Sequence, residues 1–192
     1  MFLEFYSIVV PDGQFTTQLC KLDIGDRIYV ERRSYGFLTT DRFALGKDLW
    51  MLSTGTGLAP FISILYDFAT WETYENLILV HSVRNKDELA YEEAIRNFKA
   101  NEYFSEFSSR LHYVQAVTRE EVPNTLNGRI THLLENGELE KAVGLAIDED
   151  RSRIMICGNP EMVDETRELL TRRGLRVSRR GEPGQLAVEN YW

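Results

Sequence analysis

The sequence contains few cysteines and histidines, and this scarcity excludes two kinds of structure. Its two cysteines, Cys20 and Cys157, cannot build the disulfide framework of a small secreted domain, so a reducing, cytoplasmic environment is expected. The three histidines, His81, His112 and His132, show no spacing typical of metal ligands, either among themselves or with the cysteines. No metal site is expected, and the histidines are interpreted as structural.

Long hydrophobic runs and an excess of positive charge are also missing. The longest aliphatic stretches, such as 77–80, are far too short to cross a bilayer, and the amino terminus lacks the basic start and cleavage site of a signal peptide. The formal net charge of −8 argues against broad nucleic-acid binding, which needs a basic surface. We therefore expect neither a membrane protein nor a nucleic-acid-binding protein.

A run of arginines near the carboxyl terminus is a local exception to the acidic charge. Between positions 172 and 180 lie five arginines and no acidic residue. A solvated helix end is the more common explanation of such a run. The second interpretation, a landing site for an acidic partner, needs support from elsewhere in the molecule.

The remaining composition, with 43% apolar and 27% charged residues, is typical of a soluble globular protein. Residues 1–48 contain short strand-like segments at 5–10 and 27–30, with a Pro-Asp-Gly turn at 11–13. A few short strands without a covering helix cannot close a barrel on their own. We interpret residues 1–48 as part of a larger all-β domain.

From residue 49 onward, strands alternate with helices. Short buried strands are predicted at 49–52, 77–83, 111–117 and 154–157, with a possible last one at 175–177. Helical periodicity lies between them, at 59–69, 88–101 and 161–173. Such alternation predicts crossover units and a doubly wound, mostly parallel sheet, so residues 49–192 form a nucleotide-binding α/β domain.

The most specific local motif joins the first of these strands to its helix. A Gly-x-Gly turn, Gly55 to Gly57, follows the strand, and Pro60 stands where the first helical turn should begin. Glycines let the backbone approach a phosphate closely, and a helix start offers free N–H groups. A tight turn without a ligand is the alternative explanation, and the motif alone favours nucleotide binding only modestly, because the third glycine of the dinucleotide fingerprint is replaced by Pro60.

Positively charged residues follow several of the predicted strands. Ligands of open parallel sheets bind beyond the carboxyl ends of the strands. This edge carries Val83, Arg84, Thr118, Arg119 and, in a later turn, Arg129. The second strand lacks the acidic residue that would bind a ribose 2′-hydroxyl. A surface salt bridge explains any single arginine, but three on one edge favour NADP over NAD, by about a hundredfold if two of them bind the extra phosphate.

The last long strand and the carboxyl terminus carry two further candidate contacts. Cys157 begins a Cys-Gly-Asn-Pro turn, where a small neutral side chain could contact a nicotinamide ring; a buried apolar cysteine is the other explanation. No spacing assigns it a base, so no thiolate nucleophile is proposed. The chain ends on Tyr191 and Trp192, which suggests a terminus packed on another domain or stacked on a flat cofactor.

Together these motifs resemble the bacterial ferredoxin (flavodoxin)–NADP reductases, over essentially the whole chain. The resemblance is carried by residues 3–13, 49–60, 80–84, 128–130, 157–162 and 191–192. It implies FAD between an antiparallel β-barrel and an NADP-binding α/β domain. It further implies a monomeric enzyme that transfers electrons between NADPH and ferredoxin or flavodoxin, by hydride transfer to the flavin followed by single-electron steps.

The same resemblance implies roles for individual residues. The expected FAD contacts are Tyr6, Ser7, Ile8, Val9, Gln14, Phe15, Thr16, Thr56, Tyr191 and Trp192. The expected NADP contacts are Val83, Arg84, Thr118, Arg119 and Arg129, with the arginines at the 2′-phosphate. Cys157 and Glu189 resemble catalytic positions near the reacting rings.

One departure from the family pattern leaves alternatives open. The Arg-x-Tyr-Ser motif that holds the flavin in the family is missing, so the chain is expected to lack the first part of its flavin domain. One alternative is another NAD(P)H-dependent flavin reductase, such as the reductase component of an oxygenase. The other alternative is a non-catalytic NADP-binding remnant.

Overall fold

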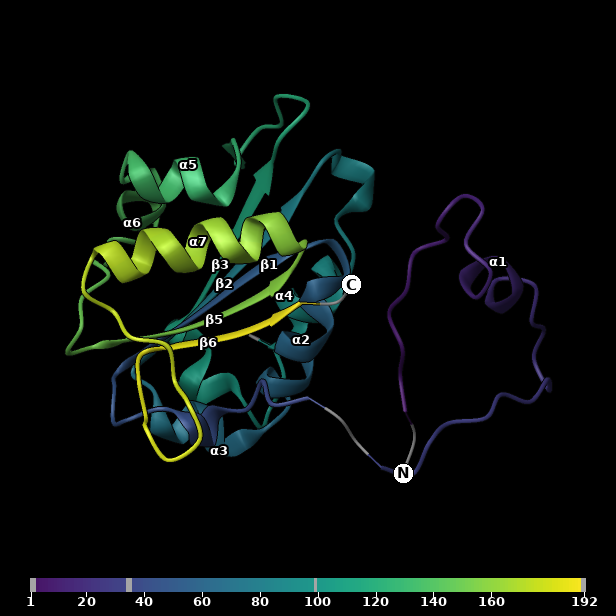
Figure 1. Cartoon of the computed structure of the whole chain (residues 1–192), viewed down its shortest axis with the longest axis horizontal. Coiled ribbons are helices and arrows are strands. Elements are labelled where there is room, and N and C mark those ends of the chain that lie inside the picture. The colour runs from purple at the N-terminus through teal and green to yellow at the C-terminus, as the bar shows by residue number, and fades with distance from the viewer. Residues whose placement is uncertain (1–2, 34–35, 99, 191–192) are drawn as a thin grey trace. The chain divides into compact units, whose positions relative to one another are not determined.

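The structure, a computed structural model, describes residues 3–33, 36–98 and 100–190. The chain divides into two compact units, Met1–Phe37 and Leu38–Trp192. Figure 1 shows the whole chain with its elements labelled. The division falls ten residues before β1 (Asp48–Thr54), the first strand of the second unit.

Among residues 3–33 of the first unit, the structure has one short helix, α1 (Thr16–Leu19). The predicted turn at 11–13 forms, and the Gly13 N–H donates to the Val10 carbonyl at 2.9 Å. The strands predicted at 5–10 and 27–30 do not form, and none occurs among residues 3–33. Strands need neighbours that accept their backbone hydrogen bonds, and this unit supplies no such ladder. The assignment of residues 1–48 to a flavin-binding barrel stays a prediction.

The second unit is built on one sheet of six strands, all paired in parallel. The spatial order is β4-β3-β2-β1-β5-β6. After β1 the strands are β2 (Asn76–Val83), β3 (Leu111–Val117), β4 (Leu126–Asn127), β5 (Ser152–Gly158) and β6 (Leu186–Asn190). The four main predicted strands and the doubly wound sheet are therefore confirmed.

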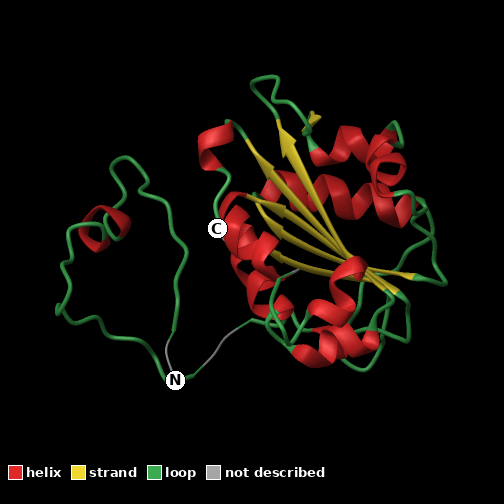
Figure 2. Ribbon diagram, turned by 180° about the vertical axis from the view of Figure 1, so that it is seen from behind, coloured by secondary structure: helices red, strands yellow, loops and turns green. Residues whose placement is uncertain are grey.

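Helices cover both faces of the sheet (Figure 2). The helices are α2 (Ala59–Leu65), α3 (Phe68–Thr73), α4 (Glu92–Phe98), α5 (Ile130–Glu135), α6 (Glu138–Val143) and α7 (Pro160–Arg172). Short 3₁₀ helices add η1 (Thr40–Arg42), η2 (Gly55–Leu58), η3 (Lys86–Glu88) and η4 (Ser105–Arg110). The predicted helix at 59–69 is divided, because Asp67 accepts from the Ala69 N–H and starts α3 as a new helix.

Each face of the sheet has its own hydrophobic core. Leu49 and Met51 of β1 pack on the side of α2 to α4, whereas Trp50 and Leu52 pack on the side of α5 to α7. All four side chains are completely buried. This strand is buried on both faces, as expected for the centre of a parallel sheet, and it reads as a continuous apolar run.

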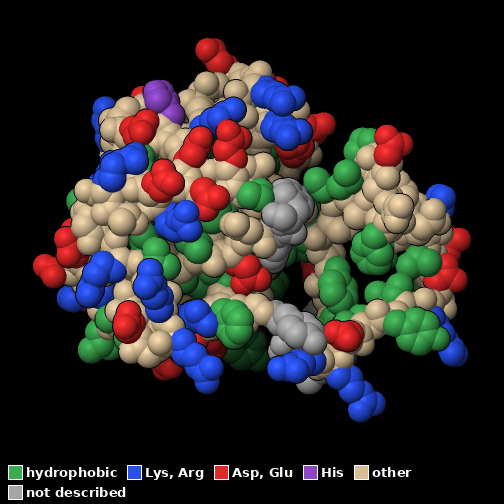
Figure 3. All heavy atoms as spheres, in the orientation of Figure 1, with side chains coloured by type: hydrophobic (Ala, Val, Ile, Leu, Met, Phe, Trp, Pro, Cys, Tyr) green, Lys and Arg blue, Asp and Glu red, His purple; other side chains and the backbone are tan. Residues whose placement is uncertain are grey.

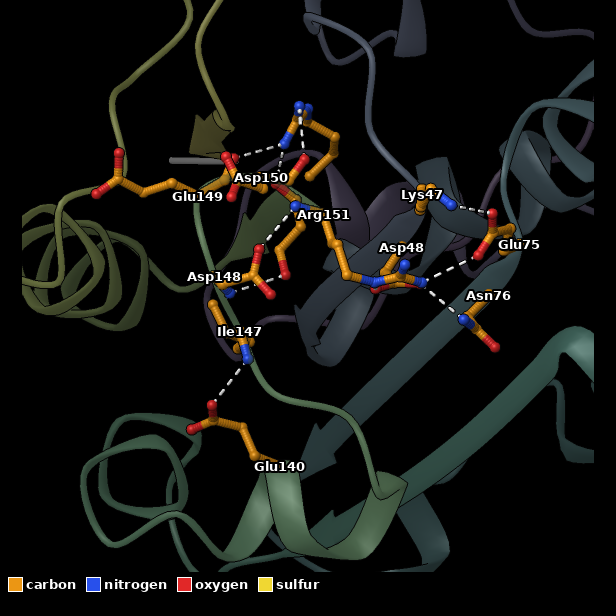
Figure 4. A network of polar contacts seen from close by, with 12 residues as sticks. Lys47, Asp48, Glu75, Asn76, Glu140, Ile147, Asp148, Glu149, Asp150 and Arg151 are labelled. Atoms are coloured by element: carbon orange, nitrogen blue, oxygen red, sulfur yellow. Dashed lines mark hydrogen bonds and ion pairs between the residues drawn. The ribbon is translucent and has the colours of Figure 1, made fainter.

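A polar network joins three strands at the edge of the sheet where they begin (Figure 4). The buried Asp48 carboxylate accepts from Arg151 Nε at 2.9 Å and Nη2 at 3.2 Å, and from Asn76 Nδ2 at 2.6 Å. Glu75 accepts from Arg151 Nη2 at 3.0 Å and from Lys47 Nζ at 2.7 Å. These contacts link the starts of β1, β2 and β5, so we name this network the amino-edge clamp.

Removing the arginine of the amino-edge clamp should destabilise the domain. Arg151→Met leaves the buried Asp48 carboxylate without its cation. We expect the free energy of unfolding to fall by about 2 kcal/mol, which is less than for a fully buried ion pair because Arg151 is partly exposed. The control Lys47→Met removes an exposed ion pair worth about 0.5 kcal/mol or less. Urea unfolding measures the stability of both variants. If both lost the same free energy of unfolding, the pair between Arg151 and the buried Asp48 would not be the dominant contact of the clamp.

Candidate functional site

The opposite edge of the sheet, where the strands end, contains the point at which strand order reverses. After β1 the chain moves to β2, β3 and β4 on one side, and β5 and β6 lie on the other. Such a reversal leaves a crevice between the two central strands, which is where doubly wound folds bind ligands. In this sheet the expected position of the crevice is beyond Thr54 of β1 and Cys157 of β5.

Two glycines bring the backbones at this crevice into close contact. A methyl group on Gly57 would overlap the Cys157 carbonyl and lie 2.7 Å from the Gly158 Cα. A methyl group on Gly158 would lie 2.6 Å from the Thr54 carbonyl oxygen. The Thr54 hydroxyl also accepts from the Asn159 N–H at 2.9 Å. The Gly-x-Gly turn and the Cys-Gly-Asn-Pro turn thus form one structure, which we name the glycine cradle.

Three arginines extend the site along the edge of the sheet. Arg84 follows β2, Arg119 follows β3 and Arg129 follows β4, and all three are exposed. The Arg119 N–H donates to the Arg84 carbonyl at 2.9 Å. No ion pair found between described residues includes any of the three. The predicted arginine edge is therefore present, with its positive charge available to a ligand.

The side chains predicted beside these arginines help to fix the loops. The Thr118 N–H and hydroxyl both donate to the Val83 carbonyl, at 3.1 and 3.2 Å. Val83 itself is buried at the end of β2. The β2 and β3 loops consequently leave the sheet as a bonded pair, and Arg84 and Arg119 leave it side by side.

A row of polar side chains crosses the sheet just below the crevice. In register from β3 to β6, it consists of Gln115, His81, Ser53, Cys157 and Glu189. Residues in register on parallel strands point to the same face, and here Cys157 belongs to the core on the side of α2 to α4. The row places the two candidate catalytic residues on adjacent strands.

His81 is completely buried within this row. Its Nδ1 lies 3.4 Å from the Tyr113 hydroxyl, and its Nε2 has no partner among the described residues. Burial lowers the pKa of His81 to about 4, although the nearby Glu92 carboxylate acts in the opposite direction. The imidazole is thus neutral at pH 7.

The remaining predicted contacts are distributed over both units. Thr56 is buried in η2, inside the glycine cradle. In the first unit, outside any strand, lie Tyr6, Ser7, Ile8, Val9, Gln14, Phe15 and Thr16. Tyr191 and Trp192 lie outside the described residues.

The run of arginines at 172–180 lies far from the glycine cradle. The helix α7 begins at Pro160 beside the cradle and runs back along the sheet for 13 residues, or about 20 Å. Arg173 pairs with Glu140 at 2.9 Å. On the face of the second unit that Figure 3 shows, acidic and basic side chains are mixed, with Lys and Arg more frequent toward the bottom of the view. The interpretation of this run as a landing site for an acidic partner stays a prediction.

Comparisons with known proteins agree with this geometry. Residues 51–168 match the family model "Oxidoreductase NAD-binding domain". The ferredoxin–NADP reductase of Azotobacter vinelandii is 44% identical over 97% of this chain and 73% of its own length. The flavodoxin/ferredoxin–NADP reductase of Buchnera aphidicola subsp. Baizongia pistaciae is 37% identical over 99% of this chain and 75% of its own. The chain belongs to the ferredoxin–NADP reductase family.

A solved structure from the ferredoxin–NADP reductase family has the same fold. This structure is the ferredoxin NADP+ reductase of Neisseria gonorrhoeae with bound FAD and NADP, and its sequence is 35% identical to this chain. The match has a TM-score of 0.87 and covers 95% of this chain and 72% of the Neisseria chain. The chain thus spans about three quarters of the length of these reductases. Within the described residues, no helix is both long enough and apolar enough to span a membrane.

Sequence reasoning missed the polar row that this member of the reductase family carries. Ser53 and His81 had no signal as site residues, since each lies inside a buried strand. The available signal was that mostly apolar strands carry a polar residue within two positions of their carboxyl ends, Ser53 in β1 and His81 in β2. Buried polar groups of this kind are costly unless they are hydrogen-bonded, so such a change deserves notice.

Proposed function

We propose that this protein transfers electrons between NADPH and ferredoxin or flavodoxin through FAD. The observation that carries the proposal is the set of Arg84, Arg119 and Arg129 on the edge beside the glycine cradle. A dinucleotide needs close backbone approach at its pyrophosphate, and a 2′-phosphate needs cations that are not already neutralised. The presence of a glycine turn and of unpaired arginines on one edge of the sheet supports the proposal.

Gly57 and Gly158 fix the glycine cradle by backbone packing, while Gly55 in the same turn has open space around it, and this supports close approach of a pyrophosphate there. In this proposal Val83 and Thr118 hold the two arginine loops, and the guanidiniums bind the 2′-phosphate. Cys157 and Glu189, neighbours in register on β5 and β6, orient the nicotinamide against the flavin. Bound FAD supplies the conversion between hydride transfer and single-electron transfer.

The flavin contacts form the second part of the proposal. Residues 6–9, 14–16 and 56 together with Tyr191 and Trp192 would bind FAD, as the family resemblance implies. We further propose that the enzyme acts as a monomer in the cytoplasm, with ferredoxin or flavodoxin as its macromolecular partner. The family membership supports these assignments, and the relatives named above carry both carriers in their names.

A second candidate is an NADP-binding module without flavin. It is favoured by the absence of strands among residues 3–33, because those residues should contribute to the flavin-binding barrel. This module would retain the glycine cradle and the arginines while lacking electron transfer.

Two measurements on the purified chain test the proposed function. Calorimetry should show NADPH bound about a hundredfold more tightly than NADH, since two charge-assisted bonds to the 2′-phosphate contribute roughly this much. Its visible spectrum after incubation with FAD should show a bound flavin. A colourless protein that binds NADPH would establish the second candidate, and a protein that prefers NADH would contradict both.

A further inference from the structure

Glu120 lies where the three arginine-bearing loops meet. It follows Arg119 directly in the sequence. Its carboxylate Oε1 accepts from the backbone N–H of Lys86, two residues after Arg84, at 2.5 Å. Its backbone carbonyl accepts from Asn127 Nδ2, two residues before Arg129, at 3.0 Å. One residue of the loop after β3 therefore bonds to the loop after β2 and to Asn127, the last residue of β4.

The bonds around Glu120 form a small organised structure. Arg84 is held at both backbone groups, because its N–H donates to Glu88 Oε2 at 3.2 Å and its carbonyl accepts from the Arg119 N–H at 2.9 Å. A depression beside these bonds is lined by Asn85, Lys86, Asp87 and Glu120. The Glu120 carboxylate thus fixes the backbone of the loop that carries Arg84, through its bond with the Lys86 N–H. It forms no ion pair with any of the three guanidiniums.

The charge of Glu120 works against binding an anion there. A carboxylate near a phosphate repels it, although water weakens this repulsion. Any benefit of Glu120 to phosphate binding must therefore come from the position of its oxygen atoms. This separation of charge from geometry makes the role testable.

We propose that Glu120 is a positioning residue that sets the spacing of Arg84, Arg119 and Arg129 for a 2′-phosphorylated adenosine. The inference rests on the proposed function, because it takes the arginine edge as the phosphate site. Glu120 touches neither the phosphate nor the reacting rings. It fixes the loops in advance, which lowers the entropy lost when the three long side chains close on the ligand.

The test compares adenosine 2′,5′-bisphosphate with 5′-AMP, which differs only in lacking the 2′-phosphate. Glu120→Ala should weaken binding of the bisphosphate about tenfold and change binding of 5′-AMP by less than about twofold, since one charge-assisted phosphate contact is lost. Glu120→Gln keeps an acceptor oxygen for the Lys86 N–H. It should bind the bisphosphate as well as the wild type or slightly more tightly, because the repulsion is gone.

Two further variants complete the calorimetric comparison. Glu121→Ala removes the same charge one residue away, where no hydrogen bond to another described residue is found, and should leave the ratio of the two affinities unchanged. Asn127→Ala breaks only the bond to the Glu120 carbonyl, and should lower the ratio about threefold, a smaller effect than Glu120→Ala. It also provides the test if Glu120→Ala does not fold.

The possible outcomes separate this inference from the proposed function. Wild-type protein that binds neither nucleotide, or binds both equally, overturns the proposed function and the inference with it. Wild-type protein that prefers the bisphosphate, with the same preference in Glu120→Ala and Asn127→Ala, overturns the inference alone. A Glu120→Gln variant as weak as Glu120→Ala also overturns it, because charge and not position would then be decisive.

Discussion

Gly57→Ala should unfold or severely weaken the nucleotide-binding unit. The new methyl group meets the backbone of Cys157 and Gly158, which belong to β5 and cannot rotate away as a side chain would. We expect a loss of at least about 3 kcal/mol in the free energy of unfolding, at the upper end for overpacking, together with loss of NADPH binding. Urea unfolding and calorimetry measure the two effects separately.

Gly55→Ala is the matched control in the same turn. No atom lies within 4 Å of the new methyl group, and the only cost is a φ of 53°, in the left-handed region. That conformation costs a non-glycine residue about 1–2 kcal/mol. If Gly55→Ala destabilised the protein as much as Gly57→Ala, the close contact between the turn after β1 and the end of β5 would not be the reason for glycine at position 57.

Acidification should destabilise the protein through His81. The pKa of this residue falls from 6.5 in the unfolded chain to about 4 in the folded one, because its burial disfavours the charged ring. Between these two values the unfolded state binds more protons than the folded state, so stability decreases as the pH falls from 6.5 to 4 and is fully present above 6.5. At 1.36 kcal/mol per pKa unit, the total loss is about 3 kcal/mol.

The pH dependence of His81→Phe isolates this contribution. The groups that face His81 are Tyr113 and Gln115 of β3, Ser53 of β1 and Glu92 of α4. Tyr113 keeps its hydrogen bond from Gln115 Nε2 at 3.2 Å when the imidazole is removed. Denaturation midpoints between pH 4 and 6.5 should therefore vary less in the variant than in the wild type. An unchanged slope would assign the acid sensitivity to other groups.

The second unit was largely predictable from the sequence because its strands are buried on both faces. Continuous apolar runs such as 49–52 and 77–80 can hardly occur elsewhere in a soluble protein, and the helices between them imply parallel pairing. Parallel pairing in turn places every strand end on one edge. That reasoning located Arg84, Arg119 and Cys157 at the site without any knowledge of contacts.

The last strand was not predictable on the same basis. The possible strand at 175–177 contributes only an isolated bridge between Val177 and Leu186, whereas the true strand is β6 (Leu186–Asn190). Both segments are short apolar runs, and local pattern cannot decide between them. The Arg176 carbonyl accepts from the N–H groups of Gln185 and Leu186, so the choice depends on a contact across the loop.

The role of Glu120 could not be predicted from the sequence for a related reason. An acidic residue after an arginine in a loop resembles any solvated surface position. Its importance depends on the Lys86 N–H and the Asn127 amide, which lie after β2 and at the end of β4 and adjoin only once the sheet is assembled. The strands predicted at 5–10 and 27–30 do not form, for the converse reason. Their side chains favour extended structure, but a local pattern cannot supply a strand to pair with.

The amino-edge clamp has an evolutionary consequence for the opposite edge. Ionic contacts that link β1, β2 and β5 are concentrated at one edge of the sheet, and the loops that we propose to bind the coenzyme lie at the other. The contacts that stabilise the fold and the residues that would select the coenzyme therefore lie at opposite edges of the same sheet. Exchanging arginines at the distal rim, for instance to accept an unphosphorylated coenzyme, can therefore proceed without first acquiring compensatory stabilising mutations.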